Sequence, residues 1–166
     1  MHKRLGVIAG AAATTLFTML GSGSGAFAHA QTQTGPATTA ATCYGNTCSG
    51  KDPNATGCAP GAQVLADMVI LGAPAAKEYL VRLSYSPTCN ASWTDIQAIN
   101  QPDCLYAESI WHEAVNNSTG ARTRTASVSD GAACSTYTVM MSRVGKSTRA
   151  CAHSSWENRD HCTPWR

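Results

Sequence analysis

The sequence predicts an all-β domain: a small antiparallel sandwich or partly open barrel that is held by disulfides and begins with a turn-rich segment. Three observations favour this fold. Three of the eight cysteines fall in residues 43–60, a stretch made mostly of turn-forming residues. Short apolar or alternating runs further along are separated by Gly, Pro, Asn and Ser, which is typical of antiparallel strands joined by turns. The chain also has few large apolar residues, so a core this small needs crosslinks to be more than marginally stable.

Alternation of apolar and polar residues locates the strands. We expect them, in chain order, at residues 64–71, 78–86, 121–129, 137–142 and 148–152. The second strand is the clearest, because Tyr79, Val81, Leu83 and Tyr85 share one side. It should end before Pro87, which has no backbone N–H to donate to a neighbouring strand.

Two later strands are expected with equally simple patterns. The third carries its arginines on one face and is followed by a Ser129-Asp130-Gly131 turn. The fourth has Tyr137, Val139 and Met141 on one side, and a turn at 144–147 leads into the fifth.

The segment Leu105 to Val115 fits two structures. Its apolar residues fall in two rows four positions apart, which is the period of a helix. The β-propensity of Ile110-Trp111 and the turn-forming run at 116–120 favour a strand instead. Both remain open, with a strand preferred.

The N-terminus has the features of a secretory signal peptide at residues 1–30. Lys3 and Arg4 lie in a positive n-region, residues 5–20 are free of charge, and Ala28-His29-Ala30 is a cleavage signature, with Ala26-Phe27-Ala28 close to it. Residues 31–42 are polar, small or β-branched and predict a flexible linker. We therefore expect a secreted, extracellular protein with a single disulfide-linked β domain at residues 43–166.

Removal of residues 1–30 takes Lys3 and Arg4 out of the charge count. Ten basic residues then balance ten acidic ones, so no basic surface for nucleic acid is predicted. The pair Arg122 and Arg124 and the arginines of residues 159–166 form local clusters too small to indicate a partner. We expect the mature protein to be a monomer with no attachment to the membrane once the signal peptide has been cleaved.

The cysteine count indicates disulfides rather than a metal site. The count is even, and no two cysteines are separated by only two residues, the spacing expected of a zinc pair. We expect Cys151 to pair with Cys162, at least one cysteine of 43–58 to reach further along the chain, and Cys104 to pair with Cys134. No metal or cofactor is predicted. The expected disulfide residues are Cys43, Cys48, Cys58, Cys89, Cys104, Cys134, Cys151 and Cys162.

Two motifs carry a family resemblance. The first is Cys-x-Gly-x-x-Cys-x-Gly-Lys-Asp-Pro-x-x-x-Gly-Cys, from Cys43 to Cys58, and the second runs from Val81 to Trp93. Together with residues 137–140 and 149–151, they resemble the DUF2690 family, secreted proteins of actinomycetes and related Gram-positive bacteria, also labelled YjfA-like. The resemblance implies a secreted, cysteine-linked β domain with Trp93 packed on a disulfide, and it implies no established activity. It leaves out Cys104, Cys134 and the tail, residues 152–166.

No catalytic site can be assembled from the sequence. His112-Glu113 lacks the second histidine of a zinc protease helix, so we expect a solvated pair. His153 and His161 flank Trp156 and suit a small metal or anion site, although a solvated loop explains them better. Arg82 is expected to pair with Asp95 or Asp103.

Binding is the preferred function class. Trp156 and Trp165 lie in a polar tail that cannot easily bury them, so they are the expected contacts to a cell-wall glycan or a protein partner. We predict a non-catalytic secreted binding module. The alternatives are a small hydrolase or transferase, or a secreted inhibitor or antimicrobial effector. An enzyme should have a concave pocket in which at least two of its titratable residues converge. The candidates are Asp95, Asp103, His112, Glu113, His153 and Asp160.

Overall fold

A computed structural model describes residues 40–73, 77–99, 108–129 and 134–166. The chain divides into two compact units, residues 1–35 and 36–166, and all described residues belong to the second. The predicted signal peptide and residues 31–39 of the predicted linker lie outside the described residues. At the end of the linker, the backbone N–H of Thr42 donates to the carbonyl of Thr56 at 2.9 Å. Within the described ranges, no helix has the length and apolarity that a membrane crossing requires.

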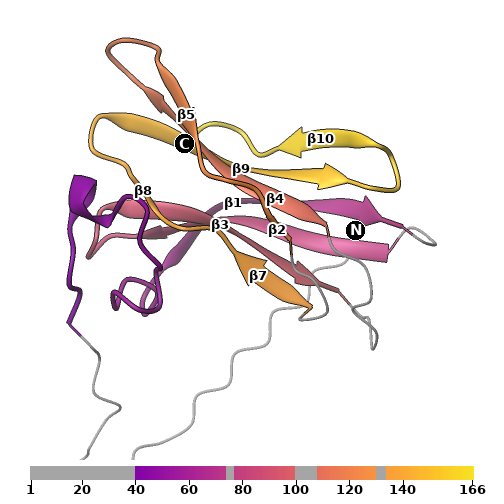
Figure 1. The fold of residues 1–166 in the computed structure, drawn as a ribbon, viewed down its shortest axis with the longest axis horizontal. Helices are drawn as coiled ribbons and strands as arrows, with labels where there is room; N and C mark the ends of the chain where they lie inside the picture. Colours follow the sequence, from indigo (N-terminus) through magenta and orange to yellow (C-terminus); the bar gives the residue numbers. More distant parts are fainter. Residues whose placement is uncertain (1–39, 74–76, 100–107, 130–133) are drawn as a thin grey trace, which may run out of the picture. The chain divides into compact units, whose positions relative to one another are not determined.

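Two antiparallel sheets make up the second unit (Figure 1). The first has the order β1-β2-β3-β7, with β8 also paired to β3. Its strands are β1 (Gln63–Gly72), β2 (Lys77–Ser86), β3 (Ala91–Ala98), β7 (Ser135–Tyr137) and β8 (Met141–Ser142).

The second sheet has the order β10-β9-β4-β5, with β6 also paired to β4. Its strands are β4 (Ser109–Asn116), β5 (Arg122–Arg124), β6 (Val128–Ser129), β9 (Lys146–Ser154) and β10 (Arg159–Cys162). Neither sheet closes into a barrel. The predicted all-β fold is confirmed in its sandwich form.

The main core lies between the two sheets. The alternation predicted for β2 buries Tyr79, Val81 and Leu83, whereas Tyr85 is only partly buried. Residues that meet them from the two sheets are Ile70, Ile96, Ile110, Ala150 and Ala152.

The ambiguous segment forms a strand, β4, as far as it is described; Leu105 to Ala107 lie outside the described residues. Ile110, His112 and Ala114 face the core, and Trp111 on the opposite face is also buried. Because both faces are covered, the strand lacks the polar side that would have given a clear two-residue period.

The predicted strand at 121–129 is interrupted. Arg122 and Arg124 share an exposed face in β5, as expected, but Thr125 leaves the ladder, and pairing resumes only at β6. Thr125 accepts a hydrogen bond at its Oγ1 from the backbone N–H of His112, 3.0 Å away. Between the pairs Glu113–Arg124 and Ile110–Val128, two residues of β4 face three of the partner chain, which is the irregularity of a bulge. Of the predicted turn that follows, residues 130 and 131 lie outside the described residues.

The predicted strand at 137–142 is interrupted: β7 ends at Tyr137, and pairing with β3 resumes only at β8. Thr138, Met140 and Ser142 are buried, whereas Tyr137 and Val139 are exposed. The segment leaves β3 between β7 and β8 because it pairs with the turn-rich segment instead: Met140 exchanges backbone hydrogen bonds with Gly50 and Lys51, both 2.9 Å.

The polar tail also differs from its prediction. β9 begins at Lys146, within the predicted turn, and continues to Ser154, where a turn leads into β10. The stretch expected to be a solvated loop is therefore mostly a hairpin, and the disulfide Cys151–Cys162 closes it as predicted.

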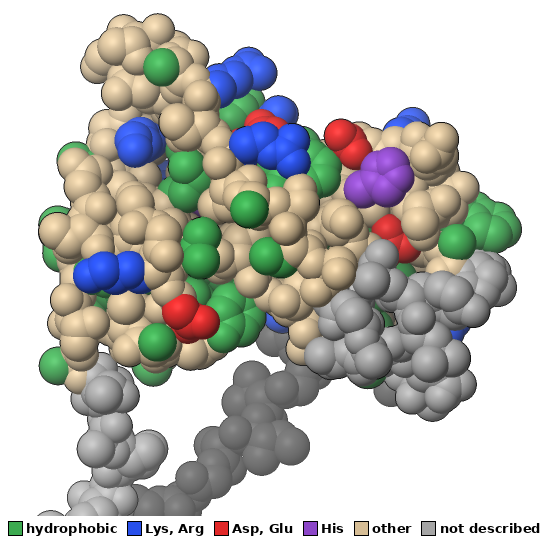
Figure 2. All heavy atoms as spheres, viewed as in Figure 1, with side chains coloured by type: hydrophobic (Ala, Val, Ile, Leu, Met, Phe, Trp, Pro, Cys, Tyr) green, Lys and Arg blue, Asp and Glu red, His purple; other side chains and the backbone are tan. Residues whose placement is uncertain are grey.

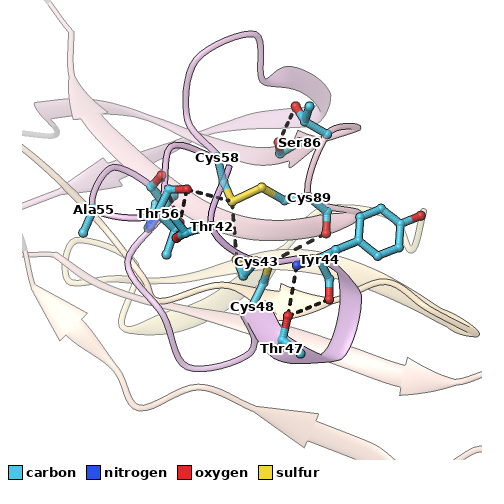
Figure 3. Close-up of a disulfide and its surroundings, with 12 residues drawn as sticks. Thr42, Cys43, Tyr44, Thr47, Cys48, Ala55, Thr56, Cys58, Ser86 and Cys89 are labelled. Carbon is cyan, nitrogen blue, oxygen red and sulfur yellow. Dashed lines mark hydrogen bonds between the residues drawn. A yellow bond between two sulfur atoms is a disulfide. The ribbon is translucent and has the colours of Figure 1, made fainter. Parts of the chain in front are cut away.

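The turn-rich segment contains the 3-10 helix η1 (Gly45–Cys48) and two disulfides (Figure 3). Cys43–Cys48 is local, whereas Cys58–Cys89 ties the segment to the turn between β2 and β3, so the expected long-range link exists. These cysteines form a second small core with Trp93, Ala91 and Met140, which confirms that Trp93 packs against a disulfide. Cys134 is also disulfide-bonded, Cys104 lies outside the described residues, and none of the described cysteines is free.

Candidate functional site

The outer face of the second sheet carries a cluster that we call the arginine–tryptophan face. It consists of Arg122, Arg124, Arg149, Glu113, Trp111 and Trp165. The strand register puts Glu113 of β4 directly between Arg124 of β5 and Arg149 of β9. Trp111 lies two residues before Glu113, so the period of the strand places both side chains on the same face.

Glu113 holds the centre of this face. Arg149 donates from Nε and Nη2 to Glu113 Oε2 at 2.9 and 2.7 Å, and Trp111 Nε1 donates to Oε1 at 2.8 Å. Burial alone would raise the pKa of Glu113. The hydrogen bonds from Trp111 and Arg149, with the charges of Arg149 and Arg124, outweigh burial and hold this pKa below its ordinary value. Glu113 is therefore ionised and fully engaged.

The indole rings order the arginines. The guanidinium carbon of Arg124 lies 4.7 Å from the ring centroid of Trp111. The corresponding distances to Trp165 are 4.4 Å for Arg149 and 5.6 Å for Arg122. All three distances are within the range of cation–π contacts, so each flexible cation is held over the face of a ring.

The end of the chain positions Trp165. Arg166 exchanges two backbone hydrogen bonds with Thr148, both 2.9 Å, and the N–H of Thr163 donates to Ala150. Residues 163–166 therefore continue along β9 after the Cys151–Cys162 disulfide. Trp165, predicted as a ligand contact, is held half-buried between two arginines rather than free in solution.

A cavity of about 240 Å³ opens on this face and is lined by Glu113, Thr123 and all three arginines. Figure 2 shows Lys and Arg side chains close to an acidic one in the upper part of the view, where Figure 1 draws the second sheet. Within the described ranges, Glu113 is the only ion-pair partner found for these arginines, and it engages Arg149. The face thus carries an excess of positive charge on a domain that is neutral as a whole.

Trp156, the other predicted contact, is not part of this cluster. It is half exposed, at 52 %, in the turn after β9. The stretch of β9 from Arg149 to Ser154 alone spans about 16 Å at the usual rise per residue. The structure therefore separates the two tryptophans.

His153 and His161 do not form a joint metal or anion site. They lie at successive ladder positions of the hairpin, opposite Asp160 and Ala152, so they project from opposite faces. Each contacts a carboxylate: His153 Nδ1 lies 2.8 Å from Asp160, and His161 Nε2 lies 2.5 Å from Glu157.

The expectation of a solvated His112 is wrong. The side chain is completely buried between the sheets, with Ser92 Oγ 2.9 Å from Nε2 and Thr94 Oγ1 3.1 Å from Nδ1. Burial, with a smaller contribution from the charge of Arg143, lowers the pKa of His112 to about 3. The imidazole is therefore a neutral link between the two sheets.

The six residues proposed as an enzymatic group are dispersed where they are described. Asp95 lines a groove on the first sheet, where it pairs with Arg82 at 2.5 Å as expected. Glu113 lines the cavity on the second sheet, His112 is in the core, and Asp103 lies outside the described residues. Only His153 and Asp160 meet, on an exposed hairpin.

Two groups of cysteines have sulfur atoms close enough together to suggest metal ligands. One is formed by Cys43, Cys48, Cys58 and Cys89, and the other by Cys151 and Cys162 with Glu113. All six sulfurs are in disulfides and cannot be thiolate ligands. Three disulfides in a small domain indicate an oxidising, non-cytoplasmic environment.

These features define a small two-sheet β domain crosslinked by disulfides, with a positively charged aromatic face. The chain belongs to the DUF2690 family, described as "Protein of unknown function", whose family model matches residues 46–152. No curated protein and no solved structure matches the chain. The match includes every residue of the arginine–tryptophan face except Trp165.

Sequence reasoning dismissed the charges that now form the site. Arg122 and Arg124 were visible as a pair on one face of an expected strand, which was the available signal. Arg149 joins them only because β4 lies between β5 and β9 in the sheet. That neighbour relation has no counterpart in the linear sequence.

Proposed function

We propose that this protein is a non-catalytic binding module that is secreted and acts outside the cell or at the cell wall. We further propose that it binds an anionic wall glycan through the arginine–tryptophan face. The observation that carries this proposal is the cavity lined by Arg122, Arg124 and Arg149, in which Glu113 is the only acidic residue.

The stacking geometry supports binding of an anion rather than a purely structural role. A guanidinium held over the face of an indole has several N–H groups, and those that the ring does not cover can donate to a carboxylate or phosphate. Because the rings already fix the arginines, little side-chain entropy is lost when a ligand binds. Arg122 and Arg124 are exposed, so a large polymer can reach them.

The test is co-sedimentation of the oxidised protein with purified cell walls, before and after chemical removal of their anionic groups. We expect binding to the intact walls, with loss after that removal and marked weakening between about 50 and 300 mM salt, because exposed charges are screened. Arg122→Gln with Arg124→Gln should weaken binding at least tenfold, and Trp165→Ala should also weaken it.

The matched control is Lys51→Gln with Arg159→Gln, which removes two charges from exposed positions outside the face. It should bind as the unchanged protein does. Equal loss in both double variants would attribute binding to overall charge, and unchanged binding in the Arg122/Arg124 variant would remove this face from the binding surface. Loss only in Trp156→Ala would place the contact on the hairpin turn instead.

A further inference from the structure

A second concave site lies on the outer face of the first sheet. It is a groove of about 370 Å³ between the turn-rich segment and the edge strand β7. Asn54, Val64 and Tyr137 line the groove together with residues of β2 and β3. The volume is at the lower end of the range for small-molecule sites, roughly 300 to 1,000 Å³.

The polar groups of the groove are charge-balanced. The register aligns Arg82, Asp95 and Tyr137 across β2, β3 and β7. Arg82 Nε donates to Asp95 Oδ1 at 2.5 Å, and Ser84 Oγ donates to Asp95 Oδ2. Tyr137 donates its hydroxyl to Asp52 Oδ2 at 3.1 Å. A ligand with a full charge would have to disrupt these pairs, so the groove suits a neutral one.

Hydrogen-bonding capacity remains for such a ligand. The ion pair uses only Nε of Arg82, which leaves its two terminal amino groups as possible donors. The Arg82 side chain is one-third exposed, and the Asn54 side chain is exposed at the rim of the groove. These planar groups can each engage two neighbouring hydroxyls.

The remaining lining is aromatic and aliphatic. Trp93 contributes to the groove beside Ser84, its partner in the ladder, and Val64 is exposed next to them. Tyr137, which also lines the groove, exposes 37 % of its surface. A pyranose has the matching chemistry, because its C–H face packs against an aromatic ring while its equatorial hydroxyls meet planar polar side chains.

We propose that this groove binds a neutral saccharide. The terminal amino groups of Arg82, which Asp95 holds in place, and the side chain of Asn54 bond to its hydroxyls, and Tyr137 packs on its ring. Both motifs by which the chain resembles its family contribute to the groove, through Pro53 and Trp93. The site is on the other sheet from the arginine–tryptophan face and does not depend on the function proposed for that face.

The experiment is calorimetric titration of the oxidised full-length protein with the N-acetylglucosamine disaccharide, cellobiose and maltose, each up to about 10 mM. We expect at least one to bind with a dissociation constant in the millimolar range or tighter. Asp95→Asn and Tyr137→Ala should each weaken that affinity at least tenfold. Tyr44→Ala, at an exposed tyrosine outside the groove, and the Arg122/Arg124 variant should leave it unchanged.

Because Asp95 is partly buried, its variant is first checked by thermal melting. Tyr137→Ala at the exposed rim tests the site if that variant does not fold. No binding by any of the three sugars, binding that both groove variants retain, or preference for glucuronic acid over the neutral sugars would each overturn the inference. If no sugar binds but the protein still co-sediments with cell walls, only the groove proposal is contradicted, and the function proposed for the arginine–tryptophan face stands.

Discussion

His112 is the residue whose environment departs most from the sequence expectation. It lies on β4 and reaches Ser92 and Thr94 on β3, so its hydrogen bonds connect the two sheets. Thr94 donates its own hydroxyl to the carbonyl of Trp111 at 2.9 Å, which leaves its oxygen to accept from Nδ1–H of a neutral imidazole. Ser92 Oγ lies 2.9 Å from Nε2 and donates to Thr148 Oγ1 of β9 at 3.1 Å. Both nitrogens of the buried ring thus lie within hydrogen-bond distance of a hydroxyl on β3.

This environment makes stability depend on pH in a predictable direction. The folded-state pKa of His112 is about 3, below its ordinary value of 6.5, so the unfolded chain binds a proton more readily. The contribution is complete above pH 6.5 and is lost as pH falls toward 3. Between pH 7 and pH 5 the free energy of unfolding should fall by about 2 kcal/mol, as measured by urea denaturation.

In the variant His112→Asn, the free energy of unfolding should change little between pH 7 and pH 5, whatever its value at pH 7. The variants His153→Gln and His161→Gln should show the same decrease as the unchanged protein. Glu113 and Asp52, whose pKa values are also lowered, contribute in the same direction only at lower pH. A stability that is constant between pH 7 and pH 5 in the unchanged protein would contradict this account of His112.

Among the elements, the turn-rich segment depends most on crosslinks. Its two disulfides differ in what they connect: Cys43–Cys48 closes five residues, whereas Cys58–Cys89 closes 31 and anchors the segment to the β2–β3 turn. The N–H of Gly45 donates to the carbonyl of Cys89 at 2.7 Å, so the same anchor also orients η1. Figure 3 shows the Tyr44 ring pointing away from these sulfurs.

Removal of the two disulfides should therefore have unequal effects. The chain-entropy relation gives about 4 kcal/mol for Cys58–Cys89 and about 2 kcal/mol for Cys43–Cys48. We expect the double variant Cys58→Ser with Cys89→Ser to lose more stability in denaturant titration and to be cut faster by trypsin at Lys51. The matched variant Cys43→Ser with Cys48→Ser is the control. Equal protease sensitivity in the two variants would show that backbone hydrogen bonds, rather than the long crosslink, hold the segment.

At the scale of the whole domain, the apolar core is small. Among the described residues, the fully buried large apolar side chains are Tyr79, Val81, Leu83, Ile96, Ile110 and Met140. A core of this size contributes only a few kcal/mol of net stability. Disulfides typically add about 2 to 4 kcal/mol each, less than additively when combined.

Complete reduction and alkylation should therefore unfold the domain under mild conditions. The expected result is loss of the near-ultraviolet circular dichroism signal and of a cooperative thermal transition. Unreduced protein denatured in guanidinium should show no reactive thiol in a titration, which confirms that the crosslinks were intact at the start. A melting temperature within a few degrees of that of the oxidised protein would mean that the sheets are stable without them.

The sequence by itself determined the class of fold, the strand β2 and the pairing of Cys151 with Cys162, and it favoured a strand at β4 without deciding it. Those features depend on local alternation, turn residues and short spacing, which are all visible along the chain. Only the tertiary structure decided which side of 137–142 is buried, because the backbone of Met140 pairs with a segment about 90 residues earlier.

The same limit applies to the candidate sites. Trp165 was predicted as a contact from its polar surroundings, but its arginine neighbours come from β5 and β9, two strands that β4 separates in the sheet. The groove likewise combines residues from the turn-rich segment, β1, β2, β3 and β7. Sequence periodicity reports which side of a strand is covered, whereas strand order and register decide which side chains meet across a sheet.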